Sequence, residues 1–358
     1  MPELNVIRST ISQLPESGPL VAVIPGGTTG IGSYIAHALA RVFANQGSKL
    51  RVYIVGRNAS RADSIINAGK AISPGSDWRF IEATNLALLG EVDKACAEIT
   101  RQEKESPLHD TPSIDLLYMT FCANILMNQI ITSEGLDSFL STVYYARIRF
   151  IQQLIPLLTA GTFPGHAISV YAGGFEDGTK PGESPIGLPP PESWGITSVR
   201  KHTGFMKNFV FEELAQKHAG KLSLTHIYPG LVDGPGFYNQ DNPTWFKFVW
   251  PIVKFLASLY MTSPENCGDV MVYLATAQFP AKESRSERTK LPEGLQVAKS
   301  TLGESCGGCY ATGQRADVAS QPIMYRNVRK PETSKLVWDH TFEVLNRVEK
   351  ENAKSSQV

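Results

Sequence analysis

The chain has 358 residues and carries 34 Lys and Arg against 34 Asp and Glu, so its formal net charge is zero. This balance gives no support for nucleic-acid binding, which relies on clustered positive charge. With 42% hydrophobic residues the chain can bury one large core. Five cysteines are too few, and odd in number, for a disulfide framework. Because no secretory signal opens the sequence, we expect a cytoplasmic protein.

Short apolar runs alternate with helical periodicity, which is typical of a doubly wound parallel α/β sheet, the Rossmann fold. Ser133 is the expected N-cap of a long fourth helix. The expected strands are 20–24, 49–57, 78–84, 114–121, 166–172 and 222–228. The expected helices are 31–45, 59–69, 88–101, 133–158, 194–218 and 264–277.

The domain organisation is expected to be simple, because no linker or internal repeat divides the chain. Residues 1–17 form a short amphipathic arm, and 18–315 form a single Rossmann domain. Within that domain, residues 242–261 are expected to form a lid over the substrate. Residues 316–358 form a C-terminal extension whose tail, after Glu349, is expected to be frayed.

A glycine-rich turn follows the first strand directly, in the sequence Pro25-Gly26-Gly27-Thr28-Thr29-Gly30-Ile31-Gly32. Such a turn lets backbone N–H groups and a helix N-terminus approach a pyrophosphate. Any tight connection from strand to helix could also use these glycines. The flanking strand and helix favour the dinucleotide site, and we assign Gly26, Thr28, Gly30 and Ile31 to it.

The second strand ends at Val55-Gly56-Arg57, where no acidic residue is present. A carboxylate at this place would bind the adenosine ribose and repel a 2′-phosphate, whereas a guanidinium attracts that phosphate. Arg57 could instead be a surface cation at the start of a helix. Together with the glycine turn, it favours NADP(H) over NAD(H).

In their order and spacing, these residues resemble the short-chain dehydrogenase/reductase family over about residues 20–310. The resemblance implies that Asn85 lies near the adenine and that Pro229 and Gly230 lie beside the nicotinamide. Gly308-Cys309-Tyr310 is similar to the family's late strand. The N-terminal arm and the segment 132–136 look most like a fungal branch that often serves secondary-metabolite pathways. The resemblance also implies a possible homodimer through the helices 133–158 and 194–218.

The catalytic residues of that family are missing from this chain. The family uses a tyrosine with a lysine four residues later, a serine and an asparagine. By counting along the helices and strands, Trp194 falls at the tyrosine, Ser198 at the lysine and Val143 at the asparagine. Val170 falls at the serine, although a shift of one residue would give Ser169. General acid–base catalysis contributes roughly 10²–10⁴-fold in rate, so losing the pair should nearly abolish ordinary carbonyl reduction. Since none of these positions carries the family's residue, the catalytic residues are left unassigned.

Replacements for the lost pair can be suggested. Tyr171 could donate a proton if its side chain faced the substrate, and Lys201 and His202 could lie near the start of their helix. The plainer interpretation of those two is a solvated helix face, and Tyr144 and Tyr145 are expected to be packing residues. An activated iminium or a conjugated acceptor would need less proton donation than an ordinary carbonyl.

Two other segments draw attention. Residues 245–261 are rich in aromatic side chains but too short and too polar to cross a membrane. They suit a lid or, as the alternative, an interfacial helix.

Cys306 and Cys309 have the spacing of half a zinc site, but no second pair accompanies them, so no metal is predicted.

Three functions remain open from the sequence. The first is an NADP(H)-dependent oxidoreductase acting on a hydrophobic small molecule that is expected to be a biosynthetic intermediate. The second is a non-redox isomerase or cyclase on the same scaffold, and the third is a nucleotide-binding pseudoenzyme.

Overall fold

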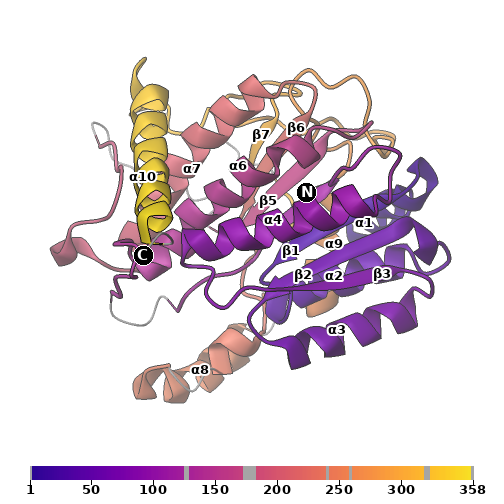
Figure 1. Ribbon diagram of the computed structural model, residues 1–358, viewed down its shortest axis with the longest axis horizontal. Coiled ribbons are helices and arrows are strands. Elements are labelled where there is room, and N and C mark those ends of the chain that lie inside the picture. The colour runs from indigo at the N-terminus through magenta and orange to yellow at the C-terminus, as the bar shows by residue number, and fades with distance from the viewer. Residues whose placement is uncertain are drawn as a thin grey trace.

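The computed structural model describes residues 2–124, 129–171, 183–238, 242–257, 260–317 and 323–355. At its centre lies a parallel sheet in the order β3-β2-β1-β4-β5-β6-β7 (Figure 1). The expected doubly wound fold is therefore confirmed. The strands are β1 (Leu20–Pro25), β2 (Leu50–Gly56), β3 (Asp77–Glu82), β4 (Leu116–Met119), β5 (Gly165–Val170), β6 (Leu222–Ile227) and β7 (Cys309–Thr312).

The central strands read as continuous apolar runs because helices cover both faces of the sheet. Every residue of β1 and β2 is buried, and the two strands pair in register from Leu20 opposite Leu50 to Pro25 opposite Val55. The chain crosses to the other side of β1 when it enters β4, so the sheet has its switch point between these two strands. Ligands of open parallel sheets bind at the carboxyl ends of the strands near such a point.

Two apolar layers enclose the sheet. One contains side chains of α1 (Leu4–Ile11), α2 (Gly30–Val42), α3 (Ala59–Ile72) and α9 (Pro264–Tyr273). The other contains side chains of α4 (Leu89–Glu105), α6 (Ala146–Leu158), α7 (Ile196–Lys217) and α10 (Thr333–Ser355). Short 3-10 turns occupy 14–17, 47–49, 191–193 and 235–238.

The N-terminal arm packs into the first of these layers. Ile7, Ile11 and Leu14 are at most 3% exposed. Arg8 Nε donates a 2.8 Å hydrogen bond to a carboxylate oxygen of Asp269 on α9. The arm is thus held by apolar burial and by an ion pair.

The helix expected over 133–158 begins later than predicted and is interrupted. Asp137, not Ser133, caps α5 (Ser138–Leu140), because its carboxylate accepts a 2.7 Å hydrogen bond from Leu140 N. A π-helical turn over Ser141–Tyr145 then leads into α6. The residues just before Asp137 do not join the helix, because the Glu134 carboxylate accepts hydrogen bonds from the first N–H groups of α4.

The C-terminal extension is an ordered helix, so the prediction of a frayed tail after Glu349 is wrong up to Ser355. Figure 1 shows α10 standing beside α4, α6 and α7. Its inward side chains recur at helical spacing, as expected for a packed face. Those fully buried there are Val337, Thr341, Leu345 and Val348.

Helix α10 also bonds to the helices beneath it. Thr341 Oγ1 lies 2.7 Å from the Tyr144 hydroxyl, and His340 Nε2 lies 2.9 Å from the Tyr145 hydroxyl. Tyr144 and Tyr145 are therefore packing residues, as expected, but their neighbour is α10. The helical face through which a homodimer was expected is covered by the chain's own C-terminal helix.

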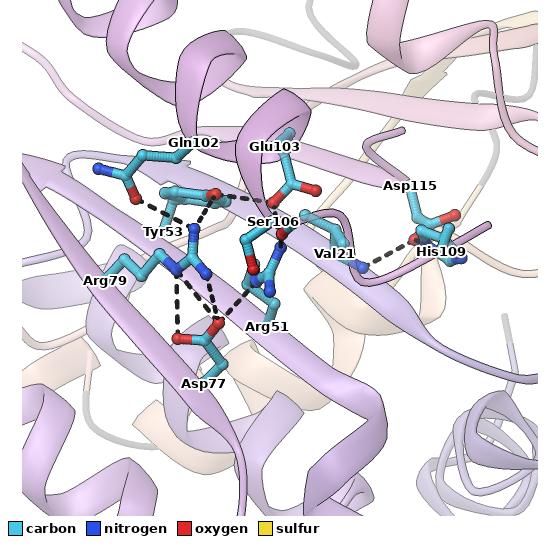
Figure 2. A network of polar contacts seen from close by, with 10 residues as sticks. All are labelled: Val21, Arg51, Tyr53, Asp77, Arg79, Gln102, Glu103, Ser106, His109 and Asp115. Carbon is cyan, nitrogen blue, oxygen red and sulfur yellow. Dashed lines mark hydrogen bonds and ion pairs between the residues drawn. The ribbon is translucent and has the colours of Figure 1, made fainter. Parts of the chain in front are cut away.

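At the amino ends of the strands, a polar network joins β2, β3 and α4 (Figure 2). Arg51 is buried and donates to Asp77 at 2.7 Å and to Glu103 at 2.8 Å. The Tyr53 hydroxyl donates to the same Glu103 carboxylate at 2.7 Å and accepts from Arg79 at 3.1 Å. Each charge in this network therefore faces an opposite charge.

Candidate coenzyme and substrate site

The glycine turn after β1 can be built only from glycines at two positions. Gly26 has φ +85°, and a Cβ there would lie 2.6 Å from Phe121 N, after β4. A Cβ on Gly32 would lie 2.4 Å from Gly26 O. The turn is thereby pressed against β4 while α2 begins immediately above it, as a pyrophosphate cradle requires.

The N-terminus of α2 is open in a way that the N-terminus of α4 is not. Thr29 is the N-cap of α2 but forms no side-chain cap hydrogen bond, and the first turn holds no acidic residue. By contrast, Glu134 accepts hydrogen bonds from Leu89 N at 2.6 Å and from Gly90 N at 2.9 Å at the start of α4. The first N–H groups of α2 are therefore available to an anion.

Thr28 lies against Gly56 at the end of β2, directly before Arg57. A Cβ on Gly56 would lie 2.9 Å from Thr28 Cγ2, so this glycine lets the turn lie against the strand end. Arg57, next along the chain, is exposed. It forms no ion pair with any residue that the structure describes, which leaves its charge open to a phosphate.

The remaining predicted coenzyme residues lie at the same edge of the sheet. Asn85 follows β3 and is exposed, and its Oδ1 accepts a 3.0 Å hydrogen bond from Ala87 N, which fixes the turn. Pro229 and Gly230 follow β6 and are half-buried. Gly230 has φ +75°, and a Cβ there would lie 2.0 Å from the Gln314 side chain.

Of the positions assigned to the family's catalytic groups by counting along the chain, the alternative at the fifth strand, Ser169, carries the expected hydroxyl and is fully buried. Val143 is fully buried in the π-helical turn, and Val170 ends β5 with 7% exposure. Trp194 precedes α7 and packs partly against the core. Ser198 is half-buried in the first turn of α7. Two of these side chains are aliphatic, and none can transfer a proton at neutral pH as the tyrosine does.

A buried arginine that the sequence did not single out lies at the carboxyl ends of β4 and β5. Arg147 is fully buried. It donates to Phe121 O at 2.7 Å, to Ser169 Oγ at 2.8 Å and to Thr142 O at 3.0 Å. The third acceptor lies in the π-helical turn, a feature that is frequent at functional sites. The guanidinium thus joins the carboxyl ends of β4 and β5 to the long helix.

Tyr171 lies at the end of β5 among aromatic and cationic neighbours. Its ring meets Phe139 edge-on with centroids 5.7 Å apart, and its carbonyl accepts a 3.2 Å hydrogen bond from Lys207 Nζ. Burial raises the pKa of the Tyr171 hydroxyl, and Arg200 and Arg147 oppose that rise.

Lys201 and His202 are both engaged in the fold of the loop before α7. Lys201 forms an ion pair with Glu183, and His202 Nδ1 lies 3.0 Å from Gly187 O. Burial lowers the pKa of the His202 imidazole. The role of His202 is therefore to hold the loop, and the solvated helix face expected for it is not what the structure shows.

The segment expected to form a lid contains α8 (Thr244–Ala257). Trp250 is buried and stacks on Phe237 with ring centroids 3.8 Å apart. On its outer face, Phe248 and Phe255 are 75% and 79% exposed. The lid over the substrate stays a prediction. None of the helices described has the length and apolar character needed to cross a bilayer.

Two other kinds of site were expected or are visible, a cavity away from the carboxyl edge of the sheet and a possible metal site. A cavity of about 210 Å³ is lined by Glu212, Thr301, Cys309 and Arg329, and Cys309 starts β7, so the cavity lies toward the amino edge. In the described ranges, no three His, Cys, Asp or Glu side chains gather as metal ligands. The five cysteines are free thiols.

The comparisons with known proteins agree with this geometry. No model of a protein family matches the chain. The short-chain dehydrogenase/reductase SAT2 of Stachybotrys chartarum is 56% identical over 354 residues, which cover 99% of each chain. Oxidoreductase AN1596 of Emericella nidulans is 31% identical and covers 97% of this chain and 99% of its own.

Solved structures share the fold at lower identity. L-sorbose reductase of Gluconobacter frateurii, solved with NADPH and L-sorbose, aligns with a TM-score of 0.52 and 17% identity over 86% of this chain and 97% of its own. YwfH, an NADPH-dependent reductase of bacilysin biosynthesis, aligns with a TM-score of 0.52 and 16% identity over 73% of this chain and 92% of its own. With a relative more than half identical along its whole length, the chain belongs to the short-chain dehydrogenase/reductase family.

Proposed function

We propose that the protein is an NADP(H)-dependent oxidoreductase that acts on a hydrophobic small molecule in a biosynthetic pathway. The observation that carries the proposal is the open N-terminus of α2 with the unpaired guanidinium of Arg57 at the neighbouring strand end. An anion at the helix start and a second phosphate at Arg57 match the two charged groups of NADP(H).

Each predicted coenzyme residue has a role in this proposal. Backbone N–H groups from Gly26 to Ile31, including that of Thr28, receive the pyrophosphate, and Arg57 pairs with the 2′-phosphate. Asn85 lies where the adenine would end, and Pro229 and Gly230 line the place of the nicotinamide. The bound coenzyme supplies or accepts a hydride, and the protein orients it and excludes water.

The substrate class rests on α8 and on the relatives. The apolar outer face of α8 would become buried if the helix closed over an apolar substrate, which is the reason for proposing a lid. The biosynthetic role is supported by YwfH, whose own reaction belongs to bacilysin biosynthesis. The five free thiols suit a reducing compartment, and we place the enzyme in the cytoplasm.

The place of α10 bears on where a homodimer could form. Because α10 covers α6 and α7, we expect any homodimer to use a different surface. Light scattering of the purified protein tests this expectation, since a dimer that dissociates on mutation of Tyr144 or Tyr145 would contradict it.

The first experiment is a titration of the purified protein with NADPH and NADH, followed by nicotinamide fluorescence. Arg57→Ala should weaken NADPH binding by roughly 10- to 100-fold, because it removes a charge-assisted contact to phosphate, and should leave NADH binding unchanged. Arg285→Ala is the matched control, since Arg285 is also exposed but lies in the segment beside the amino edge. Failure to bind either nucleotide would refute the proposal.

The two other functions give different results in the same assay. Conversion of a substrate without a change in nicotinamide absorbance would identify an isomerase or cyclase. Tight NADPH binding with no turnover of any substrate would identify a pseudoenzyme. Both remain open because the described residues hold no tyrosine and lysine at the expected positions.

A further inference from the structure

Tyr34 connects the start of α2 to the loop after β6. Its hydroxyl donates a 2.8 Å hydrogen bond to the backbone carbonyl of Asp233. Burial raises the pKa of this hydroxyl, so Tyr34 stays protonated and can donate at neutral pH. On the other side of the residue, a Cβ on Gly268 of α9 would lie 2.4 Å from the Tyr34 carbonyl oxygen. Because α9 packs so closely here, Tyr34 is a fixed point of contact for the loop.

The same loop lies against the first residue of α2. A Cβ on Gly234 would lie 3.6 Å from the Tyr34 hydroxyl and 4.0 Å from Gly30 Cα, which are ordinary van der Waals distances. Gly30 opens α2, where the pyrophosphate is proposed to bind. A bound coenzyme and this loop would therefore share the start of α2.

The side chain of Asp233 binds to α8. Its Oδ2 accepts a 2.7 Å hydrogen bond from Lys254 Nζ, and its Oδ1 accepts a 3.0 Å hydrogen bond from the Tyr238 hydroxyl. Lys254 Nζ also donates to the Tyr238 hydroxyl at 2.7 Å. The hydrogen bond from Lys254 holds the pKa of the Asp233 carboxyl below its usual value, so the carboxylate is charged at neutral pH. Asp233 thus contacts α2 through its backbone and α8 through its side chain.

Two further contacts join α8 and the residues after it to the stretch 231–238. The Trp250 ring stacks on Phe237, and Thr262 N donates a 3.0 Å hydrogen bond to Leu231 O. Figure 1 shows α8 standing apart from the sheet. These contacts and the Asp233 pair all lead to the same loop, so the position of α8 depends on it.

The contacts therefore link the coenzyme turn to the expected lid. When a bound coenzyme steadies the loop, the loop loses fewer alternative positions on holding α8, so both events favour one conformation. We propose that Asp233 is a positioning residue that couples coenzyme binding to the position of α8 and so regulates access of the hydrophobic substrate. The inference rests on the NADP(H)-dependent function proposed above and adds to it the link between coenzyme and lid.

Such a coupling acts equally in both directions. If the coenzyme makes the attachment of α8 firmer, then releasing α8 must weaken coenzyme binding by the same factor, although Lys254 is no part of the coenzyme site. The side chains of Lys254 and Asp233 are 42% and 34% exposed, and exposed pairs are weak. We therefore expect a factor at the low end of the usual range, roughly 5-fold.

The first test is a titration with NADPH, followed by nicotinamide fluorescence. Lys254→Met and Tyr34→Phe should each weaken NADPH binding by roughly 5-fold. Lys254→Arg keeps the ion pair and should retain most of the affinity. Lys247→Met is the matched control, because it removes an exposed lysine from the same helix. Unchanged NADPH affinity in Lys254→Met or in Tyr34→Phe would overturn the proposal.

A double variant separates one chain of contacts from two independent effects. Since Tyr34 and Lys254 both act through Asp233, Tyr34→Phe with Lys254→Met should weaken NADPH binding no more than the larger single change. If the two losses multiplied instead, to about 25-fold, the residues would act separately and Asp233 would not be the link.

The second test follows α8 directly by hydrogen–deuterium exchange over residues 244–257. NADPH should slow exchange there in the wild type, and this slowing should be lost in Asp233→Asn, which keeps the carbonyl that Tyr34 binds. Exchange in α10 should be alike in both proteins, which shows that the variant is folded. If NADPH binds the wild type and exchange in α8 does not change, the coupling is refuted and the coenzyme function stands. If NADPH does not bind, both are refuted.

Discussion

The two edges of the sheet handle buried charge in opposite ways. At the amino edge, Arg51 is matched by Glu103 and Asp77, so the network is closed (Figure 2). At the carboxyl edge, Arg147 is held by neutral oxygens. Balanced charges hold elements together, whereas an unbalanced charge at a strand end is free to act on a ligand.

Breaking the amino-edge network should have the largest effect on stability. Glu103→Ala removes the buried one of the two carboxylates that balance Arg51 and leaves the Tyr53 hydroxyl without its acceptor. We expect a loss of about 3–5 kcal/mol in the free energy of unfolding, measured in urea. Glu105→Ala is the control, because its pair with Arg101 is exposed to solvent and contributes little to stability. Similar losses in both variants would show that the network is not a closed unit.

Removing the carboxyl-edge charge should have a smaller effect. Arg147→Met leaves buried acceptors such as Thr142 O without a donor, but it also removes an unpaired charge and strands no carboxylate. We expect a net loss of about 1–3 kcal/mol in the same unfolding measurement. A loss larger than that of Glu103→Ala would contradict the difference between the two edges.

The smallest effect on the free energy of unfolding is expected from Asp77→Asn, and it should depend on pH. Burial would raise the pKa of this carboxyl, but hydrogen bonds from Arg79 and Arg51 hold it below its usual value. Its contribution to stability is therefore complete above the ordinary carboxyl range and is lost as pH falls through the lowered pKa. Asp77→Asn should cost below about 1 kcal/mol at neutral pH, and the difference from wild type should vanish in acid. If the stability difference between Asp77→Asn and the wild type grew in acid, the pKa of Asp77 would have to be raised and not lowered.

The sequence predicts the central fold well, and the structure gives the physical reason for the glycines after β1. Buried parallel strands are continuous apolar runs, and the glycines after β1 are required by contacts with Phe121 and within the turn itself. Both signals are local, so they can be read without knowing the tertiary structure.

The parts that the sequence did not reveal depend on contacts between distant segments. Arg147 reads as an ordinary helix residue until Phe121 and Ser169 are placed beside it. The apolar spacing from Val337 to Val348 could have indicated that α10 packs against the domain. The start of the long helix was misplaced because Glu134 serves a different helix.

Helix α10 also sets the order in which the protein can be completed. It is synthesised after α6 and α7, so the apolar face of these two helices stays uncovered until α10 has left the ribosome. A chain that stops at residue 332 would keep that face exposed. We expect such a chain to aggregate during expression, and a soluble, folded product of that length would show that the face does not need its cover.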